Sequence, residues 1–386
     1  KNEARHSRDD RRPGTELAHH LFSAGPEVAP RAIEACVRAA EQAQHHSAFD
    51  DAAEFLGRAV SLVDRSGKTD PDRYCGMLLD QARALLRAGR IDVGRQVSLD
   101  AAEEARRLGN AELLASAVLV YGSVFVYGDV DTTLIDLLQE ALAELDEGGS
   151  AERARLQARL AAAMQPSDEP EEAFQIARDA IAMARQVGEN AVLLDAIRSG
   201  CSALMDLADP AERLALNREH VALADELGQP FDAFRGHMRI VIDAIELGDV
   251  VSADRAIEAC AGLSRKTQLP HHKWPVACFR ALRASMSGDF EEAVTWLEEA
   301  SRQSNRIQDP NAARSIALQQ LGSFRAQESF DDIVALQRQL QTVFAESDFA
   351  ALFVWILCGS DFARMARSER IPAGIVDRGA QIALTY

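Results

Sequence analysis

One stretch of this chain matches the end of a nucleotide-binding phosphate loop, and it is the first place to look for chemistry. Gly67-Lys68-Thr69 carries the final Gly-Lys-Thr of that motif. A complete phosphate loop also needs a glycine five residues earlier, a preceding strand and a following helix. The residue at that earlier position is Leu62, the residues before the loop have a helical pattern, and an Asp-Pro dipeptide follows at once. The sequence therefore predicts an ordinary loop here and no nucleotide hydrolysis.

Histidine and cysteine, the side chains that most often hold transition metals, are arranged unfavourably for chelation. The histidines come largely as adjacent pairs, and adjacent residues on a helix point in different directions. The six cysteines form no C-x-x-C pair, and neither H-E-x-x-H nor G-x-S-x-G occurs. We expect no catalytic residues, no metal and no cofactor, and we expect the cysteines to be buried free thiols in a reducing compartment. The adjacent histidines are His19, His20, His45, His46, His271 and His272.

The net charge of −18 limits the classes of partner. Nucleic-acid binding and docking on anionic membranes both require a basic face, so we expect neither in this chain. Hydrophobic residues make up 47% of the chain and aromatic residues 6%. This alanine-rich composition favours closely packed helices over sheets, which are richer in branched and aromatic residues. No signal peptide opens the chain, so we expect a cytoplasmic protein.

A turn followed by an amphipathic helix recurs along the chain. The pattern is clearest at Gly288, after which Ala293, Leu297 and Ala300 share one helix face. Successive turn positions are separated by 42 residues (47 to 89), then 39 (89 to 128), and then 40 at every step from 128 to 368. A fixed period in this range is typical of helical-repeat arrays. The predicted turn positions are Ser47, Gly89, Gly128, Asp168, Ala208, Gly248, Gly288, Glu328 and Ser368.

Most repeats carry small or apolar residues five and twelve positions after the turn, where a neighbouring helix can approach closely. Two repeats depart from this rule. In the fifth, Arg213 and His220 take the two positions. In the third, Glu140 takes the second position but Ala141 stands beside it, so the pattern is displaced by about one residue.

We expect an all-α chain with two parts. Residues 1–29 are predicted to form a linker and a short junction helix that Thr15 caps, and residues 30–386 to form the repeats. Each repeat has a first helix, such as 31–46, a turn, and a second helix, such as 50–64. Because the chain starts at Lys1 and not at methionine, we expect an excised or processed piece of a longer protein.

Two stretches resemble the second helix of the tetratricopeptide repeat (TPR): Ala52-Leu56-Ala59 and Ala293-Leu297-Ala300. The period near 40 is longer than the ~34 residues usual for that family. It is similar to the period of the sensor superhelix of bacterial STAND-class signal-transduction ATPases, such as the maltose-system activator and large LuxR-type regulators. Residues 16–26, ELAHHLFSAGP, and 52–59, AAEFLGRA, resemble the junction between ATPase core and sensor in those regulators. The ATPase motifs and DNA-binding helices of that family are missing from this chain.

This resemblance implies a right-handed superhelical solenoid of about nine TPR-like helix pairs, with the first helices lining a concave groove. In that register, the residues three, six, ten and thirteen positions before each turn face the groove. Arginine recurs there, with small and apolar residues between, and guanidinium groups bind carboxylate or phosphate through paired hydrogen bonds. The predicted ligand-binding residues are Arg155, Arg198, Ser202, Met205, Arg235, Met238, Leu282 and Arg325.

Two interpretations of these arginines stay open from sequence: they bind an anionic ligand, or they pair with carboxylates on neighbouring helices. The resemblance favours a non-catalytic sensor domain of a bacterial transcriptional regulator. Its groove would take a small-molecule inducer or a peptide or protein segment, and it would act on attached or partner ATPase and DNA-binding domains. The alternatives are a free-standing TPR peptide receptor or adaptor, and a scaffold subunit.

Overall fold

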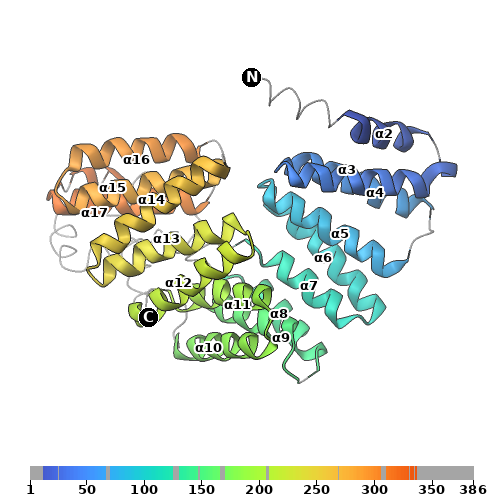
Figure 1. The fold of residues 1–386 in the computed structure, drawn as a ribbon, viewed down its shortest axis with the longest axis horizontal. Coiled ribbons are helices and arrows are strands. Elements are labelled where there is room, and N and C mark those ends of the chain that lie inside the picture. Colours follow the sequence, from blue (N-terminus) through green and yellow to red (C-terminus); the bar gives the residue numbers. More distant parts are fainter. Residues whose placement is uncertain are drawn as a thin grey trace. The chain divides into compact units, whose positions relative to one another are not determined.

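In the computed structural model of the chain, the described residues form α-helices, two short 3-10 helices and the turns between them (Figure 1). No strand occurs in the described parts, and none of their helices is both long and apolar enough to cross a bilayer. The described residues are 12–24, 26–66, 70–124, 130–146, 148–165, 170–205, 208–267, 269–305, 310–329, 331–333 and 335–336.

The chain divides into two compact units. The first comprises residues 1–125 and 132–159, and each helix from α2 to α7 contacts the next (Figure 1). Its helices are α2 (Arg12–Ser23), the 3-10 helix η1 (Pro26–Val28), α3 (Ala29–His45), α4 (Phe49–Ser66), α5 (Pro71–Arg87), α6 (Ile91–Leu108), α7 (Ala111–Tyr121), α8 (Thr132–Glu144) and most of α9 (Ala151–Ala163).

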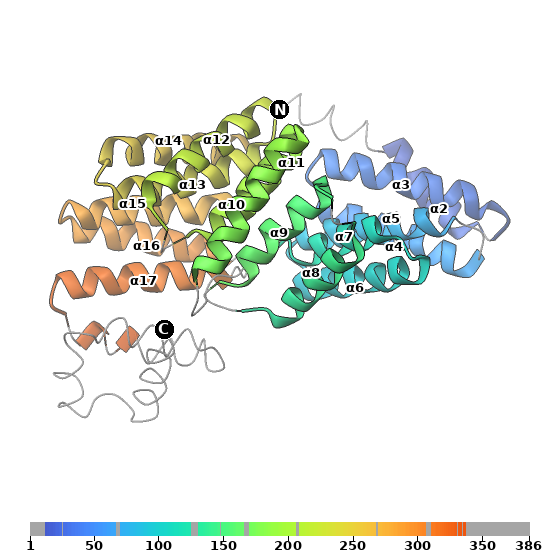
Figure 2. The ribbon, with the colours of Figure 1, turned by 90° about the horizontal axis from the view of Figure 1, so that it is seen from below.

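The second unit comprises residues 126–131 and 160–386. Consecutive helices from α10 to α17 contact each other, and the alternate helices α15 and α17 also touch (Figure 2). Its helices are α10 (Pro170–Val187), α11 (Asn190–Ala203), α12 (Pro210–Glu226), α13 (Pro230–Glu246), α14 (Val250–Thr267), the 3-10 helix η2 (Pro270–His272), α15 (Lys273–Met286), α16 (Phe290–Ser304) and α17 (Pro310–Ala326).

Five of the predicted turn positions share one backbone geometry. Gly89, Gly248 and Gly288 have φ values of 81°, 73° and 81°, a region that glycine enters without a Cβ clash. Ser47 and Glu328, at 56° and 55°, adopt the same left-handed conformation without glycine. In each of these turns the amide of the following residue donates to the carbonyl five residues earlier, as in the Schellman motif. The predicted register is therefore confirmed in the backbone at these positions.

The predicted contact positions of the second helices are buried. Nine of them have no exposed surface: Ala52, Ala59, Ala101, Ala173, Ala180, Ala253, Cys260, Ala293 and Ala300. The displacement in the third repeat is also confirmed, because Ala141 is fully buried while Glu140 is only half-buried. The predicted cap at Thr15 is wrong, since α2 begins at Arg12 and Thr15 is its fourth residue.

Replacing Ala293 by leucine is expected to lower the free energy of unfolding by roughly 1–3 kcal/mol. The Ala293 side chain is fully buried on α16, so three additional carbon atoms would force the neighbouring helix away. Val294, the next residue, is 45% exposed, and Val294→Leu is the matched control with little expected effect. Urea denaturation followed by circular dichroism measures both. Equal stability of the two variants would show that the buried face is misassigned.

Candidate functional site

Four of the predicted ligand-binding residues come together on neighbouring first helices of the second unit. Arg198 and Ser202 lie on α11, Met205 follows its end, and Arg235 lies on α13. The Arg235 guanidinium donates a hydrogen bond of 3.1 Å from Nη2 to the Ser202 hydroxyl oxygen. Arg239, one turn further along α13, contacts the Met205 sulfur. We call these five residues, with Asp232 of α13, the α11–α13 surface.

Arg198 is held by two carboxylates. Its Nη2 atom lies 2.8 Å from Asp195 Oδ1 on the same helix, and its Nη1 atom lies 3.3 Å from Asp232 Oδ1 on α13. The Arg198 side chain nevertheless stays 36% exposed, whereas that of Asp232 is 17% exposed. For Arg198, pairing with a neighbouring helix is therefore what the structure contains, and any ligand anion must compete with these two carboxylates.

The other four predicted residues lie on α13, α15, α17 and α9. Met238 is half-buried on α13 and packs against buried residues of α12, α13, α14 and α15. Leu282 is half-buried on α15, and Arg325 is exposed on α17. Arg155 belongs to the first unit, where its Nη1 atom lies 3.9 Å from Glu152 on α9. The prediction that all eight residues share one binding face is untested for these four and stays a prediction.

Helix α12, which follows α11 and precedes α13 in the sequence, carries a buried polar network. Arg213, Asn217 and His220 are 3%, 3% and 1% exposed. Arg213 Nε lies 3.0 Å from Asp243 Oδ1 of α13, and a second guanidinium nitrogen of Arg213 contacts Glu246. Asn217 Nδ2 donates a hydrogen bond of 2.8 Å to Asp243 Oδ2. We call these five residues the α12 network.

Two residues of the network occupy positions that are small or apolar in most other repeats. Arg213 and His220 stand five and twelve residues after the predicted turn, so α12 has a polar face where most of its counterparts have alanine. Space for His220 comes from Gly236 on α13. A Cβ atom built there would lie 2.9 Å from His220 Nδ1 and 2.6 Å from a Val221 methyl carbon. Only glycine allows α12 and α13 to approach this closely at that point.

Burial sets the protonation of the network. It raises the pKa of the Asp243 carboxyl, although Asn217 and Arg213 offset part of the effect. It also lowers the pKa of His220, so that this imidazole is neutral at pH 7. Burial would raise the pKa of Asp232 too, but the neighbouring His220 and Arg198 outweigh it and bring that pKa to about 2. Asp232 is therefore a permanent anion between Arg198 at the surface and His220 beneath, whose Nε2 lies 3.8 Å from Asp232 Oδ1.

Sequence reasoning missed Asp232, Arg239 and Asp243, which complete the surface and the network. The signal for the network was present, because Arg213 and His220 break the small-residue rule. Their partners on α13 were harder to identify from the sequence. Asp243 follows the apolar run Ile240-Val241-Ile242 on α13 and is itself only 4% exposed. A carboxylate at a buried helix position requires a cation nearby, and Arg213 in the preceding helix is that cation.

The part of the chain that the structure describes has neither a metal-binding cluster nor a disulfide. It holds no group of three or more histidine, cysteine, aspartate or glutamate side chains placed to bind a metal. Cys36, Cys75, Cys201, Cys260 and Cys278 are buried free thiols, as predicted. Burial raises the pKa of Cys201, Cys260 and Cys278 to about 12, which leaves them protonated and unreactive. Gly67-Lys68-Thr69 and Cys358 lie outside the described residues.

Comparison with known proteins supports the fold. No protein-family model matches the sequence, and no curated protein matches it. A Rap protein complexed with Competence and Sporulation Factor aligns with 92% of this chain and 99% of its own, at a TM-score of 0.58 and 10% identity. The apo form of RapI aligns with 91% of this chain and 98% of its own, at a TM-score of 0.52 and 12% identity.

A third solved structure is a STAND protein with a tetratricopeptide repeat sensor from Pyrococcus horikoshii. It aligns with 88% of this chain at a TM-score of 0.57 and 12% identity. The chain spans half the length of that protein. Together with the helix pairs and their turns, these likenesses show a TPR-like helical-repeat solenoid.

Proposed function

We propose that this chain is a ligand-binding helical-repeat sensor whose α11–α13 surface holds an acidic peptide segment. The observation that carries the proposal is the meeting of Arg198, Arg235 and Arg239 on two neighbouring first helices of a chain with net charge −18. Guanidinium groups bind carboxylates through two parallel hydrogen bonds. Three of them on one surface suit a ligand with several carboxylates.

The contacts of these arginines favour recognition. The hydrogen bond from Arg235 to Ser202 holds that guanidinium in place before a ligand arrives, so binding orders fewer side-chain torsions. The ion pair of Arg198 with Asp195 is partly exposed to solvent on both sides, and such pairs contribute only about 0–1 kcal/mol. A ligand carboxylate can therefore replace Asp195 while Arg198 keeps its contact with the more buried Asp232. Met205, half-buried beside Arg239, offers an adaptable apolar contact.

The solved structures with this fold support a binding role. One is a Rap protein complexed with Competence and Sporulation Factor, and another has a tetratricopeptide repeat sensor joined to a signal-transduction ATPase. By analogy, we infer that the chain senses a partner in the cytoplasm and passes this signal to ATPase and DNA-binding domains of a bacterial regulator. Ligand binding would act by favouring one of two conformational states of the attached domains.

A direct test uses two short fluorescent peptide libraries that differ only in charge. One carries aspartate and glutamate at its variable positions, and the other carries asparagine and glutamine. We expect the acidic library to contain sequences that bind the wild-type chain. Changing Arg198 and Arg235 together to glutamine should weaken the tightest of them by at least about 100-fold, since each lost charge-assisted hydrogen bond costs about 1.5–3 kcal/mol.

Arg218→Gln is the matched control for this double variant. Arg218 is an exposed arginine of α12 outside the α11–α13 surface, so its change removes charge without removing a proposed contact. If Arg218→Gln weakens binding as much as the double variant, general electrostatic attraction explains the binding and the site is wrong. Equal binding of the neutral library would contradict the proposal as well.

The near-complete alignment with a whole Rap protein favours a second candidate, a free-standing peptide receptor. Both candidates use the same binding surface. They differ in what the ligand controls, namely attached ATPase and DNA-binding domains or a separate partner protein. Sequencing the gene on both sides of this segment distinguishes them, because only the regulator would encode a complete phosphate loop upstream and a helix-turn-helix downstream.

A further inference from the structure

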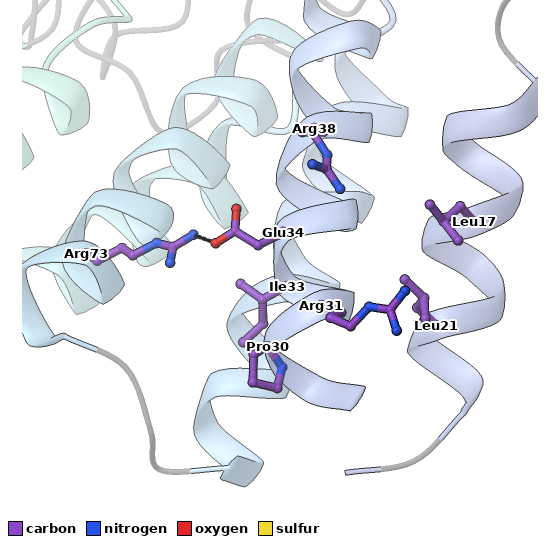
Figure 3. Close-up of a pocket in the computed structure, with 8 residues that line it drawn as sticks. All are labelled: Leu17, Leu21, Pro30, Arg31, Ile33, Glu34, Arg38 and Arg73. Atoms are coloured by element: carbon purple, nitrogen blue, oxygen red, sulfur yellow. Dashed lines mark hydrogen bonds and ion pairs between the residues drawn. The ribbon is translucent and has the colours of Figure 1, made fainter. Parts of the chain in front are cut away.

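A pocket of about 420 Å³ lies among α2, α3 and α5 in the first unit. Leu17 and Leu21 of α2 face α3 across it, and Arg31 and Arg38 project from α3 into the space between the two helices (Figure 3). Its volume falls within the range of small-molecule sites, roughly 300–1,000 Å³. The remaining lining residues are Pro30, Ile33 and Glu34 of α3 and Arg73 of α5.

The charges of the pocket are unbalanced. Arg73 is paired with Glu34, which removes one cation and one anion from the lining (Figure 3). Arg31 and Arg38 remain, seven residues apart on α3, so that they stand on one face about two helical turns from each other. No hydrogen bond or ion pair joins either of them to another residue of the described chain. The lining therefore has three arginines, one carboxylate and a formal charge of +2.

The opposite side of the pocket is apolar. Leu17 is 46% exposed and Leu21 is half-buried. Ile33 of α3, 5% exposed, is the third apolar residue of the lining besides proline. An apolar wall opposite a pair of guanidinium groups is complementary to a molecule with an anionic head and an apolar body.

We propose that this pocket binds a small amphiphile with an oxyanion head group, held by Arg31 and Arg38, and a short apolar tail against Leu17, Leu21 and Ile33. The head group is a carboxylate or a phosphate, which share this binding chemistry. The site lies in a different unit from the α11–α13 surface and requires nothing of it, so the two proposals succeed or fail separately.

Isothermal titration of the whole chain with hexyl phosphate, hexanoate and hexanol tests the proposal. We expect saturable one-to-one binding of at least one of the two anions, and binding at least tenfold weaker for hexanol. The tighter of the two anions then assigns the head group. Arg31→Gln with Arg38→Gln should weaken the bound anion by tenfold or more, and Leu17→Ser should weaken it several-fold.

Two further variants make the result specific. Arg90→Gln, at an exposed arginine outside the pocket, should leave the affinity unchanged. Glu34→Gln removes the competing carboxylate and releases Arg73, so the anion should bind several-fold more tightly. All four variants, the double arginine variant included, alter only exposed side chains, and unchanged melting temperatures would show that they are folded. The proposal is overturned if neither anion binds, if hexanol binds as tightly as the anions, or if the double arginine variant binds normally.

Discussion

Changing Asp243 to alanine is expected to lower the free energy of unfolding by about 3–5 kcal/mol. The Asp243 carboxylate accepts a hydrogen bond from Asn217 and forms an ion pair with Arg213. All three side chains are buried between α12 and α13. Without the carboxylate, the guanidinium of Arg213 would be buried beside an emptied site and would keep its contact with the half-exposed Glu246 of α13. Leaving a charge buried without its close partner is among the costliest single changes in a folded protein.

Two variants separate this ion pair from general packing. Glu246→Gln alters the partner whose side chain is 44% exposed, and it should cost only about 1 kcal/mol. Arg213→Met combined with Asp243→Leu replaces the charged pair by apolar side chains and should be far milder than Asp243→Ala alone. Urea denaturation measures all three. A cost below about 1 kcal/mol for Asp243→Ala would mean that water reaches Arg213 and that α12 lacks a buried network.

Acidification from pH 7 to pH 5 is expected to lower the free energy of unfolding by about 2 kcal/mol through His272 alone, and by about 3 kcal/mol at pH 4. His272 is 6% exposed and stacks on Phe234 with ring centroids 4.0 Å apart. Burial, with a smaller contribution from His271, lowers its pKa to about 4 from the ordinary value of 6.5. Between pH 6.5 and pH 4 the unfolded chain therefore binds a proton at His272 that the folded chain does not bind, and the free energy of unfolding falls as the pH falls.

The control for this pH effect is His272→Gln. Glutamine does not titrate, so the variant should start less stable at pH 7, having lost the stacked ring, but should lose about 2 kcal/mol less than the wild type on going to pH 5. Burial also lowers the pKa of His220 and His237, so some acid sensitivity should remain. If the two proteins have parallel stability profiles between pH 7 and pH 5, His272 is accessible to protons in the folded state.

The repeat register was predictable because it depends on residue types at fixed separations. Glycine at a left-handed turn and alanine at a close helix contact are each selected by local sterics, and both recur every 40 residues or so. Ser47 and Glu328 lack that local signal, and only the period assigned them to turns. The start of α2 was missed for the opposite reason, since Thr15 has a capping side chain but the helix continues through it to Arg12.

The candidate site was predictable only in part, because it depends on which way each helix is rotated. Arg198, Ser202 and Arg235 were placed on one face and do meet across α11 and α13. Met238 was assigned to the same face; it is half-buried and packs against buried residues of neighbouring helices, so its role in binding stays a prediction, while its neighbour Arg239 contacts Met205. The directions of successive helix residues differ by about 100°, so an error of one position in the register assigns a side chain to a different face of the helix. Ion pairs between helices, such as Arg213 with Asp243, follow from no local pattern.

Hydrogen–deuterium exchange of the whole chain, with and without the tightest acidic peptide from the library, tests the central claim most directly. Binding at the α11–α13 surface should slow amide exchange in residues 190–205 and 230–246. In the variant with Arg198 and Arg235 both changed to glutamine, the same peptide concentration should give no such protection. Protection confined to other helices, or equal protection in the double variant, would contradict the assignment of these arginines to the ligand.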